Sequence, residues 1–260
     1  MKSPISSAVL SAIIGIGCLV GLTDGSASAE TLRIQGSSQL VSQVLLPYQD
    51  RIENASGYKL NITSSKASLG LLALFDGEAD LAMVSAQVQD IVAFLQKTTP
   101  DLPYRSLRGF LVGQTRVAYP VNPDNPVRRV TSDQLKQILT GQINNWREFG
   151  GPDLPIRIVS LSDGDGARIT TQSVLLGGEQ ITSRAELRLE SMEEVVDAVA
   201  QDRGALGIAD SALLRRKGLP ELTTETAVAQ PLYLVSLGEP SDAMSTVITA
   251  ARRAMFEDNP

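Results

Sequence analysis

The sequence predicts an α/β fold that divides into lobes, with short strands leading through polar loops into helices. Three observations support this prediction. Strand and helix patterns alternate along most of the chain, as they do in open α/β sheets. One apolar segment, at 107–120, is long enough to pass from one lobe to another. Finally, a chain of 260 residues that is 43% apolar can bury a large core, as one domain or two.

The first third of the chain is predicted to alternate strands with helices. Apolar residues at helical spacing, from Val41 to Ile52, indicate the longer helix, and Gly57 and Gly77 are typical helix stops. A polar loop at 64–68 precedes the shorter helix. In chain order the expected elements are a strand at 31–35, a helix at 40–53, a strand at 58–63, a helix at 70–76 and a strand at 80–84.

The rest of the chain begins with the long strand at 107–120, and the turn cluster at 122–126 is the predicted boundary between lobes. Thr131 or Ser132 caps the next helix, which Gly141 ends. The remaining expected elements are a strand at 156–161, a turn at 162–168 that leads into a helix, a helix at 192–201, strands at 205–209 and 231–237, and a final helix at 241–256.

The first 29 residues have the composition of an export signal. Lys2 precedes an apolar run at 8–22, and the small residues at 27–29 form a cleavage site. The run is short and rich in Gly and Ser, which disfavours a membrane span. Lipid attachment at Cys18 is an alternative, but the residues before this cysteine fit a lipoprotein signal poorly. We therefore expect a cleaved signal peptide at 1–29 and a periplasmic or otherwise extracytoplasmic protein.

Missing residue types exclude several classes of function. The chain has no histidine, and its single cysteine lies within the predicted signal peptide. Cleavage would leave no cysteine, which excludes disulfides, thiol nucleophiles and Cys/His metal sites. Histidine, the commonest general base in enzymes, is absent as well. A serine nucleophile needs a base beside it, and histidine is not available for that role, so we expect neither an enzyme nor a cofactor. The formal net charge is −6 without any basic block, so nucleic acid is not an expected partner.

Four serines follow predicted strands or precede predicted helices. Ser37 and Ser38 come after the first strand, Ser68 precedes the second helix, and Ser85 follows the third strand. Taken singly, each is most simply a helix cap. Taken together they indicate a binding site, because the carboxyl ends of strands in one open sheet converge on one crevice. Hydroxyls and backbone amides in such a crevice can bind a dehydrated anion.

The turn at 162–168 lies between a predicted strand and a predicted helix, and it contains two glycines. Backbone N–H groups at a helix N-terminus attract anions, and Arg168 adds a two-pronged donor for an oxyanion. Two alternatives remain open. The turn can be an ordinary one capped by Asp163 or Asp165. It also hints at a calcium loop, although the ligand spacing of an EF-hand is absent.

The segment at 122–156 carries a recognisable motif. It contains Asn-Pro-Asp-Asn-Pro, then Leu-Thr-Gly-Gln-Ile-Asn-Asn-Trp, and finally Gly-Gly-Pro-Asp-Leu-Pro-Ile. This closely resembles the substrate-binding proteins of phosphate ABC transporters, the PstS-like family. We interpret Trp146, within the motif, as an aromatic anchor for this turn-rich segment. Weaker similarity extends over nearly all of the mature chain, notably at 36–38, 80–85, 202–208 and 230–235.

The resemblance implies a two-lobed periplasmic-binding-protein fold, type II-like, with the ligand in a cleft between the lobes. Lobe I is expected to comprise 30–112 and 226–260, and lobe II 113–225. The implied function is the capture of phosphate or a related small oxyanion for the permease of an ABC transporter. The protein is expected to be a monomer. The ligand-binding residues that the resemblance implies are Ser37, Ser38, Ser68, Ser85, Asp165, Gly166, Ala167 and Arg168.

The turn of lobe II departs from the family pattern, which is an arginine followed a few residues later by Gly-Ser-Gly-Thr. Leu161 stands where the arginine is expected, Asp165 replaces the serine, and Ala167 replaces the threonine. One hypothesis is that Asp165 accepts a proton from the bound anion while Arg168 restores positive charge. The other is that the protein binds another ligand, or is a non-transporting sensor or envelope protein with altered or lost anion binding.

Overall fold

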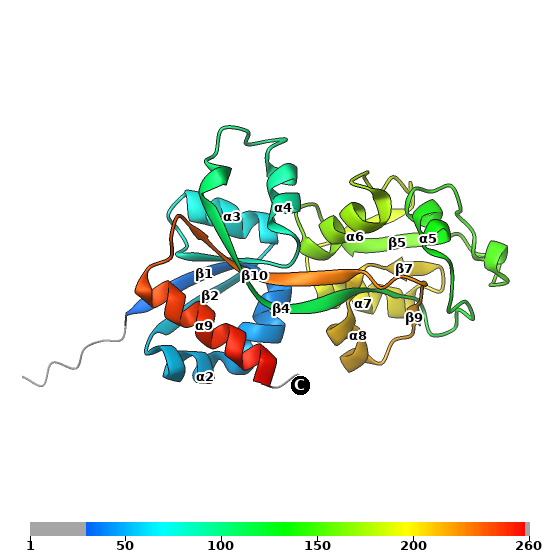
Figure 1. The fold of residues 1–260 in the computed structure, drawn as a ribbon. Coiled ribbons are helices and arrows are strands. Elements are labelled where there is room, and N and C mark those ends of the chain that lie inside the picture. The colour runs from blue at the N-terminus through cyan, green and yellow to red at the C-terminus, as the bar shows by residue number, and fades with distance from the viewer. Residues whose placement is uncertain (1–29, 258–260) are drawn as a thin grey trace, which may run out of the picture.

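The computed structural model describes residues 30–257, which form two α/β lobes joined by two long strands (Figure 1). The two-lobed α/β architecture predicted from the sequence is therefore confirmed. The predicted signal peptide, its cleavage site and Cys18 lie outside the described residues. Within residues 30–257, no helix is both long and apolar enough to cross a membrane.

Lobe I is built on a sheet whose first three strands are parallel. β1 (Thr31–Ser37) lies between β2 (Lys59–Ser65) and β3 (Leu81–Val84), and Ile34 is paired with Leu81. Parallel neighbours point the same way, so all three strands end at one edge of the sheet. The serine-rich segments that follow these strands are thereby brought to that edge.

Helices cover both faces of this sheet. α2 (Leu46–Ser56) and α9 (Asp242–Glu257) pack on one face, and α3 (Ala67–Phe75) and α4 (Val88–Leu95) pack on the other (Figure 1). Successive residues of β3 enter the two apolar clusters alternately, because side chains of a strand point to opposite faces. Both faces are thus buried, which explains the continuous apolar run of β3.

The predicted helix at 40–53 is continuous but changes its winding. It begins as α1 (Ser38–Leu40), passes through one π-helical turn, η1 (Val41–Leu45), and continues as α2. The π turn lies just before Pro47, which has no N–H to donate and crowds the carbonyl group one turn earlier. Gly57 ends the helix in the left-handed conformation, with φ of 78°.

Two antiparallel strands connect the lobes. These are β4 (Leu107–Pro120), which has its predicted bounds, and β10 (Ala229–Leu237). Near its end β4 also pairs with β8 (Ala209–Asp210) of lobe II. Val112 is part of the core of lobe I and Val117 is part of the core of lobe II, so the chain crosses between these residues.

Lobe II has its own parallel sheet of three strands. β5 (Arg157–Leu161) lies between β6 (Glu186–Leu189) and β7 (Ala205–Gly207), and α6 (Gly166–Leu176) and α7 (Met192–Gln201) pack around it. The remaining elements are α5 (Ser132–Leu139), α8 (Ser211–Lys217), β9 (Glu221–Leu222) and the short 3-10 turns η2 (Tyr104–Ser106) and η3 (Trp146–Phe149).

Trp146 anchors the turn-rich segment of lobe II, as the sequence indicates. Its side chain is fully buried, and the indole N–H donates to the carbonyl oxygen of Gly204 at 3.0 Å. Its ring also meets the ring of Phe149 edge to face. The helix before this segment, α5, is capped by Thr131, which forms a reciprocal capping box with Gln134.

Several predicted boundaries differ from the observed ones. α3 begins at Ala67, so Ser68 lies in the first helical turn and not in a loop. α6 begins at Gly166, inside the turn predicted at 162–168. The strand predicted at 205–209 is interrupted by one residue and forms β7 and β8. α4, β6 and α8 have no counterpart among the predicted elements, because each is short and carries exposed residues.

Candidate functional site

The predicted serines gather at one edge of the lobe I sheet. The Ser37 hydroxyl donates to Ser85 Oγ at 2.7 Å, and both side chains are buried. Ser38 begins α1 next to Ser37, and Ser68 lies buried in the first turn of α3. This gathering follows from the parallel order of β1, β2 and β3, whose carboxyl ends meet there.

Two glutamines that the sequence analysis did not single out support this edge. Gln39 Nε2 donates to Gln230 Oε1 at 3.0 Å, and Gln230 Nε2 donates to the carbonyl oxygen of Ser85 at 2.6 Å. Both glutamines are buried. Because Gln230 belongs to β10, the Ser85 loop is attached directly to a strand that connects the lobes. A buried polar chain of this kind stays ordered only if each member has a partner.

In lobe II, Asp165 is the N-cap of α6. Its Oδ1 accepts hydrogen bonds from the backbone N–H groups of Ala167, at 2.8 Å, and Arg168, at 3.1 Å. The side chain is 7% exposed. Burial raises the pKa of this carboxyl, although the hydrogen bonds from the amides oppose that rise. The alternative in which an aspartate caps the turn is therefore realised by Asp165.

The side chain of Arg168 differs from its expected position. It is 1% exposed, and its guanidinium is directed into lobe II. There it donates to Ser160 Oγ at 2.7 Å and forms ion pairs with Glu186 and, at 3.1 Å, with Asp163. Burial alone would raise the pKa of Glu186, but its hydrogen bonds with Arg168 and its neighbours keep it below its usual value. Only the backbone N–H of Arg168 lies at the predicted anion turn.

The two lobes touch directly at the serines. The backbone N–H of Ser68 donates to the Gly164 carbonyl oxygen at 3.2 Å. A Cβ at Gly164 would overlap Ser68 Oγ, and a Cβ at Gly166 would overlap both Ser85 Oγ and the Ser85 carbonyl oxygen. Glycine is therefore required at both positions for this close approach.

Further contacts hold the lobes together beside the serines. Ile169 of α6 packs in the apolar cluster of lobe I. α6 lies next to α4 of lobe I (Figure 1). Gln43 Nε2 donates to Asp210 Oδ1 at 2.7 Å, joining η1 to the N-cap of α8. Burial raises the pKa of the Asp210 carboxyl against its hydrogen bonds with the α8 amides. The interface between the lobes is thus both apolar and polar.

A hollow of about 320 Å³ lies between the lobes beside this contact. Two of the predicted site residues, Ser38 and Asp165, line it. Lys66 Nζ and Glu190 Oε2, from opposite lobes, form an ion pair at 3.0 Å on its wall. The other lining residues are Ser64, Ser65, Leu69, Leu161, Ser191, Met192 and Glu193. We call this space the interlobe hollow; three carboxylates and one ammonium group line it.

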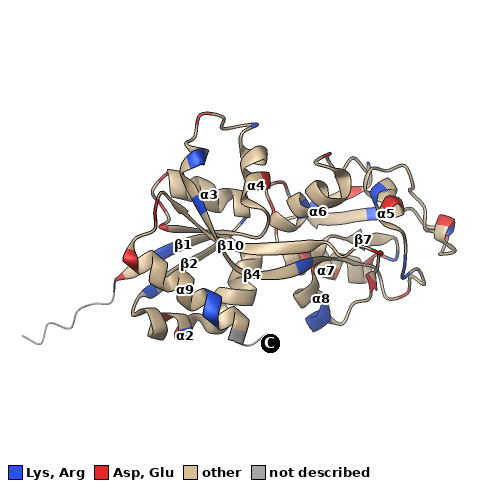
Figure 2. Cartoon of the chain, viewed as in Figure 1, with Lys and Arg blue, Asp and Glu red and all other residues tan. Residues whose placement is uncertain are grey.

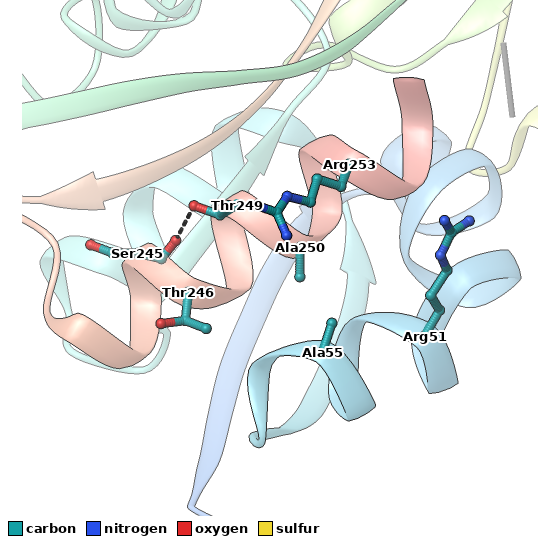
Figure 3. A pocket seen from close by; sticks show the side chains of 7 residues that line it. All are labelled: Arg51, Ala55, Ser245, Thr246, Thr249, Ala250 and Arg253. Carbon is teal, nitrogen blue, oxygen red and sulfur yellow. Dashed lines mark hydrogen bonds between the residues drawn. The ribbon is translucent and has the colours of Figure 1, made fainter. Parts of the chain in front are cut away.

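A second hollow of about 420 Å³ lies on the outside of lobe I, between α2 and α9 (Figure 3). Arg51 and Arg253 stand on its two helices, and Ala55 and Ala250 lie between them. Hydroxyl groups of α9 complete it, from Ser245, Thr246 and Thr249. It shares no residue with the interlobe hollow and contains none of the predicted site residues.

Charged residues are otherwise spread over both lobes (Figure 2). The charged residues of the interlobe hollow were missed by the sequence analysis for different reasons. Lys66 stands at the end of β2 beside Ser68, so its position in the predicted polar loop was a usable signal. Glu190 and Glu193 follow β6, which the sequence did not predict. The ion pair of Glu190 with Lys66 is a contact between lobes, for which one sequence carries no local signal.

Comparison with known proteins gives a consistent result. A family model described as "PBP superfamily domain" matches residues 23–251. The "Phosphate-binding protein PstS" of Bacillus subtilis (strain 168) is 27% identical over 177 residues. That alignment covers 68% of this chain and 56% of the Bacillus protein, so the chain spans little more than half the length of this relative.

Solved structures share the fold. A substrate-binding protein assigned to a phosphate ABC transporter of Clostridium perfringens, with bound phosphate, has a TM-score of 0.71 at 19% identity. The similarity covers 85% of this chain and 92% of that one. An ABC-type phosphate transport receptor from Vibrio cholerae has a TM-score of 0.65 at 20% identity, covering 87% of this chain and 95% of that one.

Proposed function

Because the chain belongs to the PBP superfamily, we propose that it is an exported solute-binding protein that captures phosphate or a related small oxyanion for an ABC importer. The PstS-like resemblance found at 122–156 is confirmed by the family model and by the curated relative. Those relatives are named as binding proteins and receptors, and this chain is likewise a binding protein and not an enzyme. Export is supported by the composition of the first 29 residues.

The observation that carries the proposal is the meeting of two sets of hydrogen-bond donors. Serine hydroxyls at the edge of the lobe I sheet face the N-terminus of α6 in lobe II, across contacts that only glycine permits. A small anion held between such donors needs no cationic side chain, because neutral dipoles fixed in position can replace its water. Closure of the lobes around the anion would then give the permease a signal that the site is filled.

Titration calorimetry with inorganic phosphate tests the proposal. Gly166→Ala is the test variant, because the added Cβ would overlap Ser85 and hold the lobes apart. Arg253→Ala is the matched control, since it removes a cation from the outer hollow of lobe I and leaves the interlobe hollow unchanged. We expect wild type and Arg253→Ala to bind phosphate alike, and Gly166→Ala to lose at least about tenfold in affinity.

The outcomes separate the possibilities. If Arg253→Ala loses phosphate binding and Gly166→Ala keeps it, the anion binds in the hollow between α2 and α9 on the outer surface of lobe I, and the interlobe proposal is wrong. A thermal-shift panel of phosphate, sulfate, molybdate, phosphonates and small carboxylates extends the test, because a ligand at 100 times its Kd stabilises by about 2.7 kcal/mol. No response to any of these anions would favour the non-transporting alternative.

A further inference from the structure

The N-terminus of α6 already holds an anionic group. α6 has eleven residues and begins at the contact between the lobes, so its first N–H groups are the natural donors for an anion there. In this chain two of those N–H groups, of Ala167 and Arg168, donate to Oδ1 of Asp165. A carboxylate oxygen from the protein therefore sits where an oxyanion oxygen would accept the same hydrogen bonds.

The second carboxylate oxygen of Asp165 is placed differently. Among the described residues, no side chain donates a hydrogen bond to Oδ2, although the residue is more than nine-tenths buried. Asp165 also lines the interlobe hollow. The carboxylate is thus held by the N-terminus of α6 and also forms part of the wall of the interlobe hollow.

Within residues 30–257, Arg168 and Lys66, the cations of the α6 turn and of the interlobe hollow, are already paired with carboxylates. The Arg168 guanidinium is held by Ser160, Glu186 and Asp163 in lobe II. Lys66, the cation of the interlobe hollow, is paired with Glu190, and Glu193 adds another carboxylate to the wall. A fully ionised oxyanion entering the hollow would meet carboxylates at short range in a partly dehydrated space, where repulsion is strong.

We propose that Asp165 determines the affinity and the charge preference of the interlobe site, because its carboxylate competes with the ligand for the α6 amides. Resting on the function proposed above, this means that an oxyanion binds best when Asp165 is protonated, or when the ligand itself carries only one negative charge. The serine of the family pattern at this position carries no charge and would compete less strongly for the amides. Asp165 thus makes the site a weak, charge-selective binder of oxyanions.

Two substitutions separate the charge of Asp165 from its capping role. Asp165→Asn removes the charge and keeps an oxygen that can cap α6, and Asp165→Ser removes the charge and leaves a shorter, neutral cap that competes less strongly for the amides. Asn, Ser and Asp are comparable N-caps, so both variants are expected to fold, which thermal unfolding checks. We expect both to bind inorganic phosphate at least about tenfold more tightly than wild type at pH 7.5.

The pH dependence gives a second measurement, which a purely structural role would not change. Wild-type affinity for phosphate should rise as the pH falls, in part because Asp165 becomes protonated. Other charged groups surround this region. Lys66, Glu190 and Glu193 line the interlobe hollow together with Asp165, and Arg168 with its partners Asp163 and Glu186 lies in lobe II beside the α6 turn. The informative quantity is therefore the part of the slope that Asp165→Asn removes.

Each result has a distinct meaning. Tighter phosphate binding by both variants supports the inference, and it does so even if wild type binds too weakly to measure. Equal or weaker binding by Asp165→Asn, with measurable binding by wild type, overturns the inference and leaves the proposed function intact. If wild type and both folded variants bind no oxyanion, the inference and the proposed function both fail.

Discussion

Substituting Arg168 tests the arrangement of the buried charges in lobe II. Arg168→Met replaces the guanidinium by an apolar chain of similar length and leaves Glu186, whose side chain is 8% exposed, without its buried cation. Breaking a buried ion pair from one side costs about 3–5 kcal/mol of unfolding free energy. The exposed Arg188, whose Nε lies 3.0 Å from Glu186, can compensate for only part of this loss.

Urea denaturation, followed by circular dichroism and extrapolated to water, measures the effect. The double variant Arg168→Met/Glu186→Leu is the control, because removing both charges leaves no unpaired ion. We expect the double variant to be more stable than Arg168→Met. Phosphate affinity should change much less than stability, since the guanidinium does not line the interlobe hollow. A single variant as stable as wild type, or a double variant that loses more than the single, would refute the reasoning.

Two further predictions concern lobe I and the tryptophan of lobe II. A hydrogen bond from Lys59, with others from Gln49 and Leu60, lowers the pKa of Glu53 from 4.5 to about 2. The stability that this carboxylate provides is therefore present above pH 4.5 and is lost as the pH falls toward about 2. The difference in melting temperature between wild type and Glu53→Gln should accordingly shrink over that range. Trp146→Ala should lower the free energy of unfolding, measured by urea denaturation, by about 3–5 kcal/mol, because it leaves a cavity in the core. Trp146→Phe should lower it clearly less, because the phenyl ring fills most of that space.

The fold was largely predictable because its elements have strong local signals. The strand at 107–120 and the helix at 192–201 were predicted with the bounds of β4 and α7, since turn or capping residues flank both. β6 was missed because it is a short edge strand whose residues are half-buried or exposed, so its pattern does not stand out from a loop. Periodicity detects burial, and short exposed elements have little of it.

The candidate site was predictable only in part, for a physical reason. The gathering of Ser37 and Ser85 follows from strand order, which the alternation of elements implies. The direction of the Arg168 side chain does not follow from its position, because it depends on Glu186 eighteen residues later in an unpredicted strand. The Lys66–Glu190 pair depends on the distance between lobes, about which a sequence pattern carries no information.

The pairing of β4 with β10 has a mechanical consequence. These two strands form a ribbon that is shared by both halves of the molecule, and its ladder has an irregularity between Leu232 and Tyr233. Any rotation of one half against the other must therefore be absorbed as twist and flexure of this ribbon, and irregularities are where such ribbons bend. Gln230 lies two residues before that irregularity and donates a hydrogen bond to the carbonyl oxygen of Ser85, so the serine edge is linked directly to the irregular part of the ribbon.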